Sequence, residues 1–86
     1  MHETSIIQNL IVLLRNVCEK ENAIRVVSVE MTVNVYSCLD EGNLNFIFSA
    51  MTEKEPWLKD ARIRIKRSEK IQDREYVVDN VEIEVK

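Results

Sequence analysis

The only histidine of this chain is residue 2, and it stands between the amino-terminal methionine and Glu3. In such a terminus, the α-amine of Met1, the amide nitrogen of His2 and the Nδ1 atom of His2 can bind one ion in two fused chelate rings. Three nitrogens in one plane suit Ni(II) or Cu(II), which favour square-planar nitrogen and oxygen donors. A carboxylate of Glu3 or Asp40 could supply the fourth ligand. The spacing alone does not distinguish this site from an exposed chain end that carries histidine by accident.

The rest of the sequence offers no set of catalytic residues. A nucleophile needs a nearby base and an orienting group, and the single histidine is at the chain end. Cys18 and Cys38 form no C-x-x-C pair. We predict that they are two buried thiols in a reducing compartment, with a disulfide between them as the alternative. Two cysteines and one histidine cannot build a closed four-ligand zinc site, so we expect neither an enzyme nor structural zinc.

Composition indicates one globular domain. The chain has 86 residues, of which 45% are hydrophobic and 31% are charged, and its net charge is −3. This charge argues against nucleic acid as a partner, because nucleic-acid binding usually needs a basic patch. The longest apolar run, residues 10–14, is far shorter than the roughly 20 residues that span a bilayer. No leader sequence precedes it, and we expect a cytoplasmic protein without a membrane partner.

Apolar residues at spacings of three and four predict a helix over residues 5–21, with Ser5 and Gln8 as a capping box and Asn22 as its stop. A second helix is expected after Asp40, a good N-cap, and before Pro56. Four of its side chains should be buried, with Phe46 on the flank: Leu44, Ile47, Phe48 and Met51.

Alternation of apolar and polar residues predicts three strands. The first covers residues 25–36, with Val27, Val29, Met31, Val33 and Val35 facing inward. The second covers 61–66, with Ala61, Ile63 and Ile65 facing inward, and a polar loop at 67–74 follows it. The last covers 75–86, where the alternation changes phase at Asp79–Asn80. Such a change marks either a two-residue turn or a bulge, and we favour the bulge.

These elements predict an α+β fold, in which a three-stranded mixed sheet carries two helices on one face, in the order helix-strand-helix-strand-strand. Each strand has one polar side, and charges of opposite sign follow these sides. The basic residues are Arg62, Arg64 and Lys66, and the acidic residues expected across from them are Glu82, Glu84 and Glu30. Such pairs contribute roughly 0.2–1 kcal/mol each on a solvated sheet face, and a binding surface is the alternative.

Several segments resemble the HypA family of nickel metallochaperones for hydrogenase and urease maturation. The start M-H-E-x-S-I opens an amphipathic helix, as in that family. The family's L-S-G-V-D-P-E-A-L-R-F-A-F stretch is similar to a run containing Leu39, Asp40 and L-N-F-I-F at 44–48. D-A-R-I-R-I at 60–65 and V-E-I-E-V at 81–85 resemble the family's later strands. The resemblance covers residues 1–66 and 75–86.

The resemblance implies that His2 binds nickel together with the Met1 amine and Glu3. It also implies the fold expected above and partners such as a maturation GTPase or an apo nickel enzyme, for example hydrogenase. Family members carry a zinc domain with two C-x-x-C pairs before the last strand, where this chain has only the loop 67–74. The chain thus resembles a single nickel-binding domain over residues 1–86, without structural zinc and with weak, exchangeable Ni(II).

Two functions remain open at this point. The chain is either a nickel-binding accessory of nickel-enzyme maturation or a metal-free interaction module derived from the chaperone's nickel domain. Three changes from the family pattern affect the surface for partners: Asn34 and Val35 replace a glycine and a glutamate, and Ser49 replaces an acid.

Overall fold

The computed structural model describes residues 3–72 and 74–86. Within them the chain forms five elements in the order predicted: α1 (Glu3–Glu21), β1 (Ala23–Asn34), α2 (Glu41–Thr52), β2 (Arg62–Ser68) and β3 (Tyr76–Val85). Two helices and one three-stranded mixed sheet confirm the α+β fold. Over the described residues, no helix is both long enough and apolar enough to cross a membrane.

Helix α1 buries one apolar side against the sheet. It begins at Glu3, two residues earlier than predicted, so Ser5 lies inside the first turn and is not the N-cap. It ends where expected, because Asn22 adopts a φ of 54°, a left-handed conformation that commonly ends helices and that asparagine tolerates. Its buried residues follow the predicted spacing: Ile6, Ile7, Leu10, Ile11, Leu14 and Cys18.

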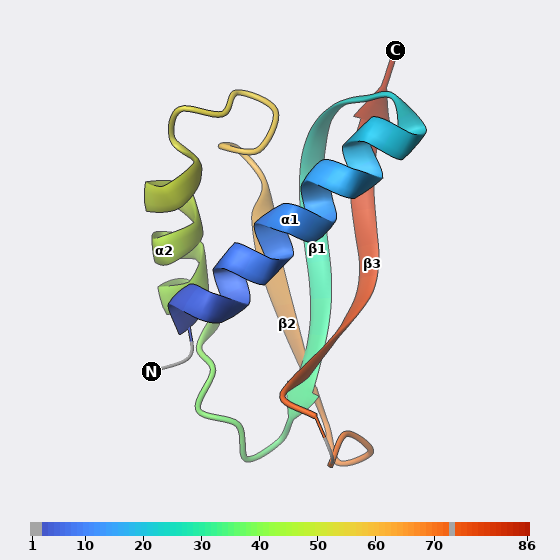
Figure 1. The fold of residues 1–86 in the computed structure, drawn as a ribbon. Coiled ribbons are helices and arrows are strands. Elements are labelled where there is room, and N and C mark those ends of the chain that lie inside the picture. The colour runs from blue at the N-terminus through green and yellow to red at the C-terminus, as the bar shows by residue number, and fades with distance from the viewer. Residues whose placement is uncertain (1–2, 73) are drawn as a thin grey trace.

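The sheet has the order β2-β1-β3, so the longest strand is central. β2 runs parallel to β1, and β3 runs antiparallel to it. Figure 1 shows α1 crossing one face of the sheet in front of β1, with α2 beside it near β2. Contacts between α1 and β1, α1 and α2, and α2 and β2 hold these layers together. β2 continues to Ser68, so the connection before β3 is shorter than the predicted loop 67–74.

The central strand contains a bulge that the alternation did not predict. Val26 pairs with Ile83 and Ser28 pairs with Glu82, which leaves Val27 as an extra residue on β1. As a result, Val26 is buried at 1% exposure, whereas Val27 is only half-buried. The prediction that Val27 faces inward was therefore wrong. From Val29 onward the predicted inward residues Val29, Met31 and Val33 are buried, but Val35 lies beyond the end of the strand.

The phase change in the last strand is a bulge, as predicted. Glu30 pairs with Asn80 and Met31 pairs with Val78, so Asp79 is the extra residue on β3. The strand runs without a turn from Tyr76 to Val85.

Helix α2 is rotated relative to the prediction. Asp40 is its N-cap, as expected, and its side chain accepts a hydrogen bond from the backbone N–H of Asn43 at 2.9 Å. Met51, however, is exposed and not buried. The buried side of the helix consists of Leu44, Asn45, Phe48 and Thr52. The helix turns this side inward because Asn45 bonds to the backbone of β2.

Candidate functional site

The predicted metal ligands lie at the start of α1. Met1 and His2 fall outside the described residues, so nothing here places their nitrogens. Glu3 is the first residue of the helix and is half-buried. In Figure 1 the first turn of α1 lies in front of α2, and the two helices pack against each other.

Asp40, the other carboxylate considered as a ligand, already has a structural role. One of its oxygens, Oδ2, accepts the N–H of Asn43 and so caps the start of α2. The second oxygen is not needed for that hydrogen bond. In the described part of the chain, no three His, Cys, Asp or Glu side chains gather as a metal site.

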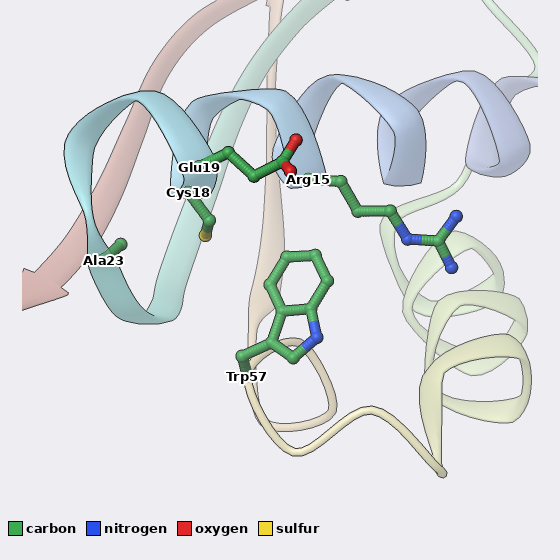
Figure 2. Close-up of a pocket in the computed structure, with 5 residues that line it drawn as sticks. All are labelled: Arg15, Cys18, Glu19, Ala23 and Trp57. Atoms are coloured by element: carbon green, nitrogen blue, oxygen red, sulfur yellow. The ribbon is translucent and has the colours of Figure 1, made fainter.

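A pocket of about 320 Å³ lies at the opposite end of α1 and is lined by Arg15, Cys18, Glu19, Ala23 and Trp57. Figure 2 shows the Trp57 indole lying across from the helix that carries Cys18 and Arg15. Trp57 is fixed by its backbone, because its carbonyl accepts the N–H of Val26 at 2.9 Å. Arg15 turns toward an ion pair with Glu55, at 2.8 Å.

The chemistry of this pocket does not suit catalysis. Burial raises the pKa of the Cys18 thiol, which favours the protonated form, and the thiolate is the nucleophilic form. The residues that line the pocket include no histidine that could act as a base. The pocket therefore offers a cavity with one aromatic wall, formed by Trp57, but no activated nucleophile.

The two cysteines differ from the prediction in one respect. Both are free thiols, so the alternative of a disulfide is wrong. Cys18 is buried as expected, whereas Cys38 is exposed in the connection before α2. Cys38 is exposed because it lies in an irregular segment, between the end of β1 and the cap of α2, where no alternation or helical stripe turns it inward.

The polar face of the sheet carries the predicted charges in a different arrangement. Because β1 is central, Ser28 lies between Arg62 and Glu82, and these two charges are not direct neighbours. Of the three acidic residues expected across from the basic row, the register places Glu30 directly opposite Arg64, whereas Glu82 and Glu84 lie opposite Ser28 and Arg25 of β1. An ion pair on this face joins Arg25 to Glu84. The face therefore changes from basic on β2 to acidic on β3.

The outer edge of β2 is bonded to α2 through two side chains, which we call the edge clamp: Glu41 and Asn45. Asn45 donates to the carbonyl of Ile63 at 2.9 Å and accepts the N–H of Ile63 at 2.8 Å. Glu41 accepts the N–H of Ile65 at 2.8 Å. The sequence analysis missed this contact. The available signal was the spacing of four between Glu41 and Asn45, which puts both on one side of a helix.

Comparison with known proteins agrees with this architecture. A family model described as "Hydrogenase/urease nickel incorporation, metallochaperone, hypA" matches residues 1–83. The solution structure of the Ni metallochaperone HypA from Helicobacter pylori is similar, with a TM-score of 0.80, 20% sequence identity and 100% of both chains covered. The solution structure of a HypA protein has a TM-score of 0.66 and 18% identity, covering 96% of this chain and 92% of that chain. No curated protein matches significantly.

Proposed function

Because the chain belongs to the HypA family of hydrogenase and urease nickel-incorporation metallochaperones, we propose that it binds Ni(II) through its own amino terminus and delivers the ion. Its task is then metal delivery and not catalysis. The ligands are the Met1 amine, the amide nitrogen and Nδ1 of His2, and the Glu3 carboxylate.

The observation that carries this proposal is the start of α1 at Glu3. The first four N–H groups of a helix have no acceptor within it. In the proposal, the metal takes the place of the proton on the amide of residue 2, and loss of an N–H at this end removes no hydrogen bond from the helix described from Glu3 onward. A negatively charged nitrogen is also favoured beside the positive end of the helix dipole.

The position of Glu3 supports its role as the oxygen ligand. As the first helical residue it follows the chelating nitrogens directly, and its backbone is held by the helix. With part of the coordination left to solvent, we expect weak and exchangeable binding, which suits transfer to a partner.

The partner in this proposal is a maturation GTPase or an apo nickel enzyme such as hydrogenase. The chain acts as one domain of residues 1–86, in which the short connection after β2 takes the place of the family's zinc domain. We propose that no structural zinc is bound.

The test is a nickel titration of protein with its native terminus, compared with His2→Ala and with a form carrying a tag before Met1. Both changes destroy the fused chelate, so both should weaken nickel binding equally. Affinity should also fall as the pH drops below about 6.5, because protons compete for the imidazole and amine. Gln8→Ala, an exposed change on α1, is the matched control and should bind like the parent.

Equal nickel affinity for the native, tagged and His2→Ala forms would contradict the proposal. In that case the domain would be a metal-free interaction module, and Glu3 would serve only the start of α1.

A further inference from the structure

The outer edge of β3 is an open strand edge. β3 is ten residues long and pairs only with β1 among the described residues. In an antiparallel pair, every second residue points its N–H and C=O away from the partner. β3 therefore presents a row of backbone donors and acceptors along the side that faces away from β1.

A new strand can join the sheet more readily at this edge than at β2. On β2 the outward backbone groups of Ile63 and the N–H of Ile65 are already bonded to the edge clamp. No corresponding side chain of the described residues bonds to the backbone of β3. The sheet is thus closed on one side and open on the other.

The polar side of the open edge is acidic. It carries Asp79, Glu82 and Glu84, and only Glu84 forms an ion pair, with Arg25. Glu82 accepts a hydrogen bond from the Ser28 hydroxyl, and Asp79 accepts one from the Thr32 hydroxyl. These hydroxyl donors carry no charge, and none of the ion pairs of the described residues includes Asp79 or Glu82.

The helix-facing side of the same edge is apolar and incompletely covered. Val78, Val81 and Ile83 pack against the core but are only partly buried, and Val85 is 54% exposed. An added strand with apolar residues on this side would bury these side chains further, and removal of their apolar surface from water favours binding.

We propose that the edge of β3 binds an extended segment of a partner protein, in which Lys or Arg alternates with Val, Ile or Leu. The backbone of the segment would continue the sheet, its cations would meet Asp79 and Glu82, and its apolar residues would cover Val81 and Ile83. Addition of a strand to a sheet edge is a general mode of peptide recognition, in which alternate side chains give specificity.

A second copy of the chain fits this edge poorly. Antiparallel pairing of β3 with β3 brings two acidic rows together, and like charges on opposed strands are destabilising. Parallel pairing through the same edge places the acidic side of one copy beside the apolar side of the other, which leaves both sides poorly matched. The basic strand of a second copy is β2, whose edge is closed by the clamp. The charge of the open edge thus selects a cationic partner that is not the chain itself.

The test uses a synthetic peptide of the length of β3 that alternates Lys with Val, and a matched peptide that alternates Glu with Val. Hydrogen exchange of the intact protein should show new protection of β3 amides with the Lys peptide and no change along β2. Glu82→Lys should weaken binding of the Lys peptide by about fivefold or more and should strengthen binding of the Glu peptide. Glu53→Lys, an exposed change at the far end of α2, is the control.

Three results would overturn the proposal. One is equal binding of the Lys and Glu peptides, and another is protection that appears away from β3. The third is protection of β3 that rises with protein concentration in the absence of peptide, which would show that a second copy occupies the edge. The exchange pattern of each variant without peptide reports whether Glu82→Lys still folds.

Discussion

The two edge strands of the sheet differ in whether their outer backbone groups are hydrogen-bonded, and chain topology explains the difference. β2 is parallel to β1, so the chain must cross over between them, and α2 lies in that crossover. Helix α2 therefore lies beside β2, and the edge clamp on this helix bonds to the outer backbone groups of β2. β3 is antiparallel to β1 and follows β2 through a short connection, so no helix of the described residues covers its outer edge. A parallel edge strand needs a crossover that can place a helix beside it, whereas an antiparallel strand reached by a short connection does not.

The open edge still has features that discourage unwanted pairing. Charged side chains and bulges are the usual means by which edge strands avoid aggregation. β3 has both, since Glu82 and Glu84 line its polar side and Asp79 forms its bulge. The same features that repel a second acidic strand favour a cationic one.

Among the variants that test the difference between the covered edge of β2 and the open edge of β3, Phe48→Ala is expected to have the largest effect. Phe48 has no exposed surface and anchors α2 over the core, so its loss should cost about 3–5 kcal/mol of unfolding free energy. Equilibrium denaturation measures this cost. Phe46→Ala is the matched control on the same helix, because Phe46 is 74% exposed and its removal should change stability by less than about 0.5 kcal/mol. Equal midpoints for the two variants would mean that Phe48 does not hold α2 in place.

A smaller effect is expected from Asn45→Ala, which removes the centre of the edge clamp. The N–H and C=O of Ile63 both lose their partner, and an unsatisfied buried polar group costs about 1–3 kcal/mol. We expect a loss of about 3 kcal/mol and faster hydrogen exchange at Ile63. Asn43→Ala, at an exposed position of the same helix, should behave like the parent. Unchanged exchange at Ile63 would show that the clamp does not protect the edge.

The smallest effect is expected from Glu41→Ala. Glu41 is exposed and its carboxylate accepts one hydrogen bond, from the N–H of Ile65, so the loss should be about 1 kcal/mol. Glu41→Gln keeps a side-chain oxygen that can accept the same bond and should retain most of the stability. Denaturation of the three forms should rank parent, Gln and Ala in that order. If Gln and Ala are equally destabilised, the charge of Glu41 matters more than its hydrogen bond.

Much of the fold was predictable because the apolar periods of its helices and strands are clear. The bulge on β3 was visible because apolar residues lie on both sides of the phase change, at Val78 and Val81. The bulge on β1 was hidden, because Val26 and Val27 are the same residue type and either one continues an alternation. Only the pairing with β3, which is a long-range contact, decides which of the two valines enters the core.

The edge clamp escaped prediction for a different reason. The buried side of the second helix was predicted from its apolar residues alone, but Asn45 is a buried polar residue because it bonds to a neighbouring strand. For the candidate metal site, the prediction of Ni(II) binding came from the position of His2 directly after the amino-terminal Met1. The structure adds the position of Glu3 at the start of α1.

The length of α1 has a practical consequence for spectroscopy. The helix has 19 residues, which corresponds to about 28 Å at 1.5 Å per residue. The chain's single tryptophan, Trp57, lies near its far end, beside Cys18 and Glu19. Indole fluorescence therefore reports unfolding of the core, while an ion bound at the proposed site next to Glu3 would be too far away to quench it by contact. One sample can thus yield stability from emission and nickel occupancy from absorbance, as two independent signals.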